Sequence, residues 1–322
     1  MTTPVDRSTT WPYEDGEPGR FSYSRFHNPT MAEAERRLGE LDGGDALLFS
    51  SGAAASTSVL LALLSPGQTV ALAEGCYYGT GVLLDELARW GVEKVEFDQT
   101  GPPPAGADLV WLEAPSNPFL TMPDFAAAAA HPARVVCDST AATPLHVRPL
   151  ERGCDVVVHS ATKYLTGHDD ALLGAVVCGN GEDAVRLLEF RSRTGPVPAA
   201  DTAWLLLRGL QTLEVRVTRQ TESASTIVER LRAQPAVRTV RYPGFGGLVS
   251  FDVEDAESAR RVETSTKLIE NKTSLGGVSS SIEARARWEG DRVPPGLLRL
   301  SVGLESADAL WDDLEQALGR DR

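Results

Sequence analysis

Between residues 45 and 179 the chain alternates short apolar runs with segments of helical character. The apolar runs are TVALAEG (69–75), DLVWLEAP (108–115), RVVCDST (134–140), DVVVHSAT (155–162) and LLGAVVCG (172–179). Strands that are apolar along their whole length are typical of a sheet with helices on both faces. Helical segments between them, such as 81–91 and 124–132, imply right-handed crossovers. We therefore predict an α/β fold with a mainly parallel sheet.

The length of 322 residues favours two domains. A long helix is expected from 198 to 230, with a break near Gly209. Beyond it, strand-like RTVRYPG, GLVSFDV and LLRLSVG alternate with helical ESARRVETSTKL and ALWDDLEQAL, which indicates a smaller α/β unit. The opening residues are rich in Pro, Gly, Arg and Tyr and indicate an arm. We predict an arm over 1–40, a large domain over 41–205 and a small C-terminal domain over 206–322.

Composition excludes several classes of partner. The chain has 31 Lys plus Arg against 45 Asp plus Glu, a formal net charge of −14, so neither nucleic acid nor an anionic membrane is expected to bind. No apolar run approaches the ~20 residues of a membrane span, and the first residues lack the apolar core of a secretory signal. The four cysteines form no C-x-x-C pair, which favours reduced, buried thiols in a cytoplasmic protein over disulfides or a metal site.

The segment FSSGAAASTSVLLALL (49–64) places Gly52 at the start of an expected helix. A helix N-terminus offers unpaired amide groups and the positive end of a dipole, and glycine lets a phosphate approach closely. The alternative is ordinary capping of the helix by Ser50 or Ser51.

Polar side chains follow the buried runs, at the edge where parallel sheets bind ligands. Each has an ordinary interpretation: Asn117 precedes a proline in a turn, Asp138 caps a helix, and Lys163 is a solvated lysine. Together they suit pyridoxal phosphate (PLP). This cofactor needs a lysine amine for its aldehyde, a carboxylate near its pyridine nitrogen and donors for its phosphate. The residues that follow the runs are Glu113, Asn117, Asp138, Ser160, Thr162 and Lys163.

In this interpretation Lys163 forms a Schiff base with the cofactor and, once released by substrate, moves protons between carbons. Asp138 keeps the ring nitrogen protonated, so that the ring accepts electrons from a Cα carbanion. Ser160 and Thr162 supply hydroxyls to the phosphate beside the Gly52 loop.

Nine segments, in order from about Phe21 to Leu318, resemble the Cys/Met-metabolism family of PLP enzymes. That family includes cystathionine γ-lyase, cystathionine γ-synthase, methionine γ-lyase and O-acetylhomoserine sulfhydrylase. The resemblance implies the PLP-dependent transferase fold of type I, which is aspartate aminotransferase-like. The segments are YSRFHNPT (23–30), FSSGAAA (49–55), CYYGT (76–80), EAPSNP (113–118), VVCDST (135–140), SATKYLTGH (160–168), LLRGLQTLEVR (206–216), SLGG (274–277) and RLSVGLE (299–305).

The resemblance also implies roles around the cofactor. Lys163 matches the Schiff-base lysine, and Asp138, 25 positions earlier, matches the partner of the pyridine nitrogen. Tyr77 matches a tyrosine that stacks on the ring and is assigned a part in substrate deprotonation. The backbone of Gly52 and Ala53 matches the phosphate loop, and Ser160 and Thr162 match its hydroxyl donors.

Other matches imply a shared site and a substrate pocket. Tyr23 and Arg25 match a pair that reaches the phosphate of the neighbouring subunit, which implies a homodimer at least, and a tetramer is expected. Arg299 matches the residue that holds the substrate α-carboxylate, a task suited to a guanidinium, with Asn117 and Ser274 beside it.

We expect a PLP-dependent carbon–sulfur lyase of transsulfuration, with α,γ-elimination like that of cystathionine γ-lyase. The enzyme alternatives are γ-replacement, as in cystathionine γ-synthase or O-acylhomoserine sulfhydrylase, and methionine γ-lyase. The non-enzyme alternative is an inactive PLP-fold binding module. Asp169, Thr273 and Ser279 depart from the family's pattern near the substrate, so the sequence leaves the substrate open.

Overall fold

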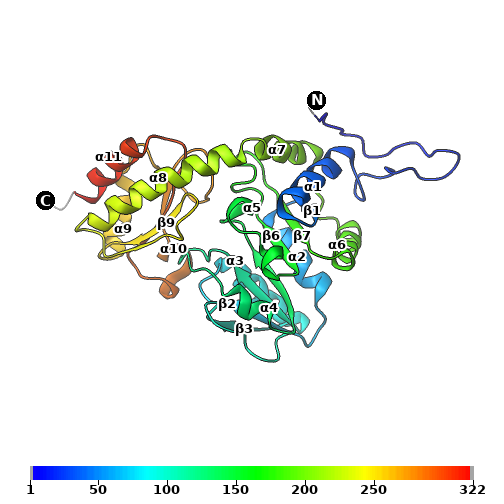
Figure 1. The fold of residues 1–322 in the computed structure, drawn as a ribbon, viewed down its shortest axis with the longest axis horizontal. Helices are drawn as coiled ribbons and strands as arrows, with labels where there is room; N and C mark the ends of the chain where they lie inside the picture. Colours follow the sequence, from blue (N-terminus) through cyan, green and yellow to red (C-terminus); the bar gives the residue numbers. More distant parts are fainter. Residues whose placement is uncertain (1–2, 320–322) are drawn as a thin grey trace.

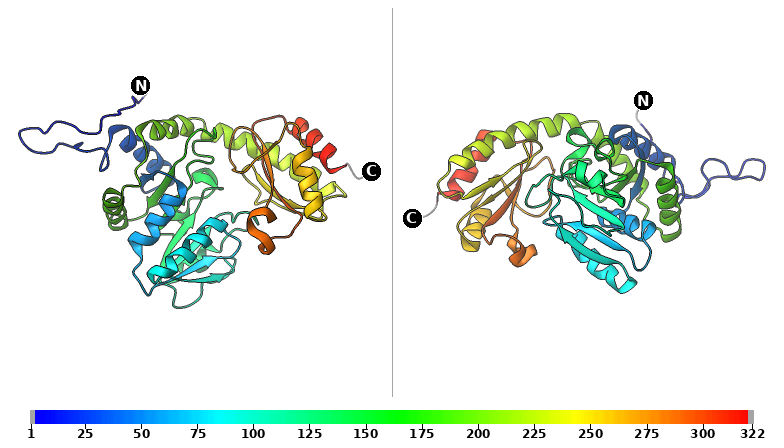
Figure 2. Two further views of the ribbon diagram at one scale, coloured as in Figure 1. Left: turned by 180° about the vertical axis from the view of Figure 1, so that it is seen from behind. Right: turned by 60° about the horizontal axis from the view of Figure 1, so that its bottom comes forward.

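A computed structural model describes residues 3–319, so residues 1–2 of the predicted arm and 320–322 of the predicted small domain lie outside the described residues. Two β-sheets form two units joined by a long helix, α8 (Leu213–Ala233), which runs from the larger unit along the smaller one (Figures 1 and 2). In the described part of the chain, no helix has the length and apolar character needed to cross a membrane.

The larger sheet has seven strands in the order β1-β7-β6-β5-β4-β2-β3. The pairs β3–β2, β2–β4, β4–β5 and β5–β6 are parallel, whereas β7 is antiparallel to both β1 and β6. The predicted mainly parallel sheet is therefore confirmed, with β7 as the exception because no crossover helix separates it from β6. The strands are β1 (Asp45–Phe49), β2 (Thr69–Ala73), β3 (Glu93–Phe97), β4 (Leu109–Glu113), β5 (Arg134–Asp138), β6 (Val156–His159) and β7 (Gly174–Cys178).

Helices cover both faces of this sheet, which explains why its strands are apolar throughout. On β1, Phe49 packs with Leu60 in one core cluster, while Leu48 packs with Leu38 and Leu206 in the other. Side chains alternate between faces along a strand, so neighbouring residues reach opposite cores. The helices and 3-10 turns are α1 (Pro29–Asp42), α2 (Gly52–Leu63), α3 (Tyr78–Leu87), η1 (Ala88–Trp90), α4 (Phe125–Ala129), α5 (Thr143–His146), η2 (Pro149–Arg152), α6 (Gly181–Thr194) and α7 (Ala200–Leu210).

The smaller sheet has five strands in the order β10-β11-β12-β9-β8, with Phe251, Leu300 and Leu314 in its core. It is antiparallel except for the short β10–β11 pair. Strand β11 was not predicted, because its four residues, SIEA, include a glutamate and form no apolar run. The elements are β8 (Thr239–Arg241), β9 (Leu248–Asp252), α9 (Ala256–Ser265), β10 (Glu270–Asn271), β11 (Ser281–Ala284), α10 (Ala286–Glu289), η3 (Gly290–Arg292), β12 (Leu297–Ser301) and α11 (Ala307–Leu318).

The break predicted near Gly209 lies between α7 and α8. A Cβ at Gly209 would lie 2.5 Å from the carbonyl oxygen of Leu165, so a larger residue would push α7 off the turn that carries Lys163. Arg216 at the start of α8 fixes the same contact, because its Nη1 donates to the carbonyl of Tyr164 at 2.9 Å.

The N-terminal segment 3–28 is an extended loop that projects from the larger unit (Figures 1 and 2). Helix α1, which the predicted arm over 1–40 includes in part, instead packs in the core through Met31, Ala34 and Leu38. The extended arm is therefore shorter than predicted. The division at residues 41 and 206 stays a prediction.

Candidate active site

A cavity of about 480 Å³ lies at the carboxyl ends of β4, β5 and β6, where the smaller unit faces the larger sheet. The larger unit contributes Gly52, Asp138 and Lys163 to its lining, and the smaller unit contributes Ser274 and Arg299. All of the predicted site residues except Tyr23 and Arg25 line this cavity. The structure thus brings together side chains from distant parts of the chain at the carboxyl ends of the strands, where the sequence predicted that a ligand would bind.

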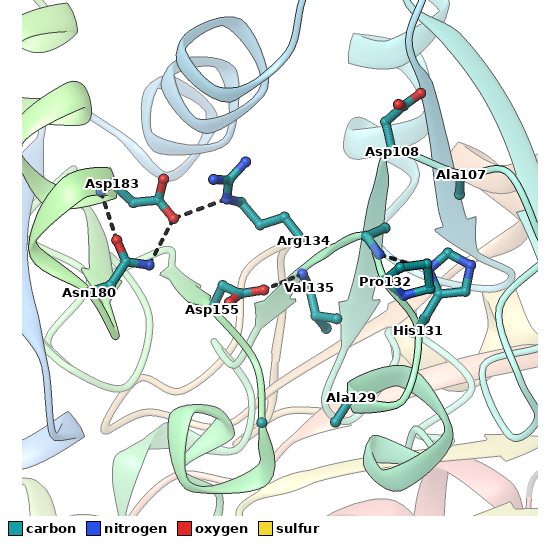
Figure 3. Close-up of a pocket in the computed structure, with 12 residues that line it drawn as sticks. Ala107, Asp108, Ala129, His131, Pro132, Arg134, Val135, Asp155, Asn180 and Asp183 are labelled. Carbon is teal, nitrogen blue, oxygen red and sulfur yellow. Dashed lines mark hydrogen bonds and ion pairs between the residues drawn. The ribbon is translucent and has the colours of Figure 1, made fainter.

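A second cavity, of about 590 Å³, lies at the amino-terminal ends of β4, β5 and β6, opposite the first cavity (Figure 3). Its lining includes Asp108, just before β4, and Arg134, the first residue of β5. Figure 3 shows Arg134 directed toward Asp183, to which its Nε donates a hydrogen bond at 3.0 Å. This cavity contains no lysine and its carboxylates outnumber its guanidinium, so it does not suit an aldehyde cofactor with a phosphate.

Lys163 lies in a tight turn directly after β6. The turn is closed by hydrogen bonds from Lys163 N to Ser160 O at 3.0 Å and from Gly167 N to Lys163 O at 2.8 Å. Its Nζ atom donates to Ser274 Oγ at 3.0 Å. Burial, and secondly the charge of Arg299, lower the pKa of the Lys163 amine. A lowered pKa favours the neutral amine, the form that attacks an aldehyde.

Asp138 is the last residue of β5 and is buried. Its Oδ1 accepts a hydrogen bond from Thr140 N at 2.9 Å. Burial raises the pKa of the Asp138 carboxyl, because a charged group loses hydration there. A buried carboxylate of this kind is stabilised by a cationic partner in the cavity, which a protonated ring nitrogen would provide.

The N-terminus of α2 forms another wall of the cavity. Ser51 caps the helix, its Oγ accepting from Ala54 N at 3.0 Å, so the capping considered as an alternative does occur. Capping satisfies only one amide, and the first amides of a helix have no carbonyl partner within it. A Cβ at Gly52 would lie 2.7 Å from the Ser160 side chain, so glycine is needed for this close approach. Capping and anion binding are therefore compatible here.

Of the two hydroxyls predicted to bind the phosphate, those of Ser160 and Thr162, the hydroxyl of Thr162 already makes two hydrogen bonds within the chain. Thr162 Oγ1 accepts from Leu173 N at 2.9 Å and donates to Leu173 O at 3.2 Å, so this hydroxyl links the start of β7 to the turn that contains Lys163.

Sequence reasoning missed Thr140. Its amide holds Asp138, and its Oγ1 accepts from Ser160 N at 2.8 Å, so it links the ends of two strands. Its position two residues after the strand-end aspartate was the available signal.

Arg299 on β12 lies buried at the substrate side of the cavity. Its Nη1 donates to Asn117 Oδ1 at 2.9 Å, and its Nη2 donates to Ser274 O at 3.0 Å and to Glu283 Oε2 at 3.1 Å. Burial, and secondly the charge of Arg285, lower the pKa of Arg299 to about 10, which leaves it a cation at neutral pH. A buried cation here is suited to hold a carboxylate.

Tyr77 lies at the rim of the cavity, with its ring partly exposed and close to Tyr78. Glu113 at the end of β4 holds this rim. One of its oxygens, Oε2, accepts from Tyr77 N at 2.6 Å and from Asn117 N at 3.1 Å. Sequence reasoning placed Glu113 at the strand end without a role. Burial, and then the influence of Tyr78, raise the pKa of the Tyr77 phenol.

Tyr23 and Arg25 belong to the N-terminal segment 3–28, and neither lines the cavity of its own chain. Arg25 Nη1 donates to Ser192 O at 2.9 Å, and its guanidinium lies over the rings of Tyr23 and Phe26. Their predicted role in a neighbouring subunit stays a prediction.

Sequence reasoning also missed a cluster of charged groups on β11 and α10. Glu283, Arg285 and Glu289 are buried and joined by hydrogen bonds, and Trp288 lines the cavity beside them. Alternating charges in SIEARARWEG, next to a buried strand, were the signal available in the sequence.

The chain is similar to known proteins over nearly its whole length. Residues 1–319 match the family described as Cys/Met metabolism PLP-dependent enzyme. The chain is 36% identical to cystathionine γ-synthase of Mycobacterium tuberculosis, over 99% of this chain and 92% of the relative. It is 36% identical to L-methionine γ-lyase of Pseudomonas putida, over 94% of this chain and 86% of the relative. The crystal structure of cystathionine γ-lyase CalE6 from Micromonospora echinospora superposes with a TM-score of 0.93 at 37% identity, covering 98% of this chain and 93% of that one.

Proposed function

Because the chain belongs to the Cys/Met metabolism family of PLP-dependent enzymes, we propose that it is a carbon–sulfur lyase that catalyses α,γ-elimination, as cystathionine γ-lyase does. The observation that carries this proposal is the contact of Lys163 Nζ with Ser274, whose carbonyl in turn binds Arg299. The Lys163 amine and a cation suited to the α-carboxylate of an amino acid thus contact the same residue.

The residues present fit PLP. Lys163 would hold its aldehyde carbon, Asp138 its ring nitrogen, and the start of α2 at Gly52 and Ala53, with Ser160, its phosphate. The cradle that a Cβ at Gly52 would fill and the buried carboxylate of Asp138 both support this placement. PLP, when bound, supplies an electron sink for negative charge at the substrate Cα.

The chain's own groups then have separate tasks. Arg299, oriented by Asn117, binds and orients the α-carboxylate. Lys163 Nζ accepts the proton from Cα, a role favoured by its lowered pKa, and must give that proton up before it can accept one from Cβ. The raised pKa of Tyr77 keeps its phenol protonated near neutral pH, so its hydroxyl is suited to donate a proton to the departing sulfur.

The net reaction is balanced by water. The Cγ–S bond breaks, the sulfur leaves as a thiol with one proton, and hydrolysis of the remaining unsaturated amine gives a 2-oxoacid and ammonium. No oxidant or reductant is required. In the alternative, γ-replacement, a thiol adds at Cγ instead and the amino group is retained.

We also propose a homodimer at least, with a tetramer as the expected assembly and sites shared through Tyr23 and Arg25. The arm that carries both residues projects from its own subunit, which supports a contact elsewhere (Figure 2). A cytoplasmic location is supported by the four cysteines, which are all buried as free thiols.

A substrate panel tests the proposed reaction. The protein reconstituted with PLP is incubated with cystathionine, methionine, homocysteine, cysteine and O-acylhomoserines, with and without an added thiol. Elimination predicts 2-oxoacid and ammonium in equal amounts without a thiol. New thioether without 2-oxoacid would show replacement instead, and no product from any substrate would contradict both.

A further inference from the structure

Trp288 on α10 contributes a large apolar surface to the same cavity as Lys163. Trp288 is 50% exposed, and the cavity is also lined by Leu83 and the exposed Leu172. Large apolar side chains that gather around a pocket mark a surface that a ligand covers. Neither the α-carboxylate contact nor the proton transfers use Trp288.

The polar atom of Trp288 is already engaged. Its Nε1 donates to Glu283 Oε1 at 2.6 Å, and Glu283 is buried at 2% exposure. The indole therefore has its donor occupied, and the surface left for the cavity is the apolar ring. The same carboxylate, through Oε2, binds Arg299 at 3.1 Å, so the orientation of Trp288 is tied to the carboxylate-binding residue.

The charges around Trp288 are balanced. Arg285 donates to Glu283 Oε2 at 2.6 Å, and through Nε and Nη2 to Glu289 Oε1 at 3.0 and 2.8 Å. With Arg299, the cluster contains two guanidinium groups and two carboxylates. Among residues 3–319, the cationic side chains lining this cavity are Lys163, Arg285 and Arg299. Once Arg299 holds the α-carboxylate, a second carboxylate at the far end of a substrate would find Arg285 already paired twice.

We propose that Trp288 determines specificity, by packing on the γ-substituent and favouring thioether amino acids whose sulfur carries an uncharged apolar group over those with a distal charged group. This inference rests on the proposed elimination. Its physical basis is that apolar groups gain free energy when removed from water, whereas a distal carboxylate would lose hydration without gaining a free cation.

A series of S-alkyl homocysteines tests the apolar contact. Methionine and its S-ethyl and S-propyl homologues are compared by kcat/KM for release of 2-oxoacid. In the wild-type enzyme each added methylene should raise kcat/KM about fourfold. Trp288→Ala should flatten this dependence, and Trp288→Phe, which keeps a smaller apolar ring, should give an intermediate slope. Trp90→Ala, which removes an exposed tryptophan outside the cavity, is the matched control and should keep the wild-type slope.

Glu289→Gln tests the charge balance by removing a negative charge that pairs with Arg285. Glu289 binds Arg285 but makes no hydrogen bond to Arg299, so the substitution frees positive charge near Trp288 while leaving the α-carboxylate contact in place. The kcat/KM ratio of cystathionine to methionine should rise by roughly tenfold. The assays use mildly alkaline buffer, because burial raises the pKa of Glu289.

The outcomes separate this inference from the proposed function. If wild-type protein eliminates thioethers but Trp288→Ala and Trp288→Phe keep the wild-type slope, Trp288 does not determine specificity and the elimination stands. A wild-type preference for cystathionine over methionine, or a cystathionine-to-methionine ratio that Glu289→Gln leaves unchanged, would also overturn the inference. If no thioether releases 2-oxoacid, the proposed elimination itself fails, and the inference fails with it. Should Trp288→Ala not fold, Trp288→Phe carries the test alone.

Discussion

The amine of Lys163 and the hydroxyl of Ser274 lie 3.0 Å apart, although 111 positions separate them in the chain. Ser274 has a φ of 96°, in the left-handed region that non-glycine residues rarely adopt. Its backbone carbonyl accepts from Arg299 at 3.0 Å. One strained residue of the smaller unit therefore orients both the amine and the guanidinium.

Replacing Ser274 with alanine should lower kcat/KM by up to about tenfold, since the hydrogen bond between its hydroxyl and the Lys163 amine contributes at most about 1.5 kcal/mol. Alanine keeps the Cβ atom, so the backbone strain is unchanged and the loss reports on the hydroxyl. Steady-state kinetics, with PLP content measured in parallel, give the result. Ser279→Ala, outside the cavity lining, is the control and should be neutral. Equal losses in both variants would contradict the role of Ser274.

The pH dependence of cofactor capture should reveal the lowered pKa of Lys163. The neutral amine reacts, so the rate at which PLP-free protein captures PLP should rise with pH and level off below the ordinary lysine pKa of 10.5. Arg299 lowers the pKa of Lys163 and Asp169 raises it. Arg299→Gln should therefore move the profile to higher pH, and Asp169→Asn should move it to lower pH. Shifts in the same direction would show that these charges do not act on the amine.

A methyl group at Gly52 should weaken PLP binding. The added Cβ would meet Ser160 Cβ at 2.7 Å and force α2 away from the end of β6, which Lys163 follows. We expect the Kd for PLP to rise at least tenfold in Gly52→Ala, measured by titrating PLP-free protein. Gly181→Ala, where a Cβ would meet no neighbour within 4 Å, is the matched helix-start control. Unchanged affinity in Gly52→Ala would argue against the α2 cradle.

Mixed subunits test the shared site. Arg25→Ala and Lys163→Ala proteins should each be inactive or nearly so. Dissociation and reassociation of an equal mixture should restore up to about a quarter of wild-type activity, because random pairing makes half of the dimers mixed and each mixed dimer holds one intact site. A mixture that shows hybrid dimers by native mass spectrometry but no recovery would place Arg25 outside the neighbouring site.

The sequence predicted best what depends on local pattern. Asp138 and Lys163 directly follow apolar strands, so the parallel-sheet rule alone brought them to one edge. Ser274 and Arg299 follow no such rule. They reach the cavity only because the smaller unit faces the larger sheet, and the family resemblance pointed to them before any pattern did.

The missed features have a common physical cause, since they depend on tertiary pairing. The direction of β7 follows from the path of the 160–173 turn, which Thr162 fixes by its two hydrogen bonds to Leu173. The roles of Glu113 and Glu283 are to hold donors from distant segments. From the sequence alone a glutamate is expected at the surface, so the burial of Glu113 and Glu283 becomes clear only once their hydrogen-bond partners are known.

Covalent capture of the cofactor tests the central claim most directly. The chain contains four lysines, Lys94, Lys163, Lys267 and Lys272, so borohydride reduction of the PLP-loaded protein followed by peptide mass mapping identifies the attachment site without ambiguity. We expect a single stable adduct on Lys163, accompanied by a visible absorption band that Lys163→Ala abolishes together with turnover. A protein that stays colourless with PLP, or an adduct only on another lysine, would contradict it.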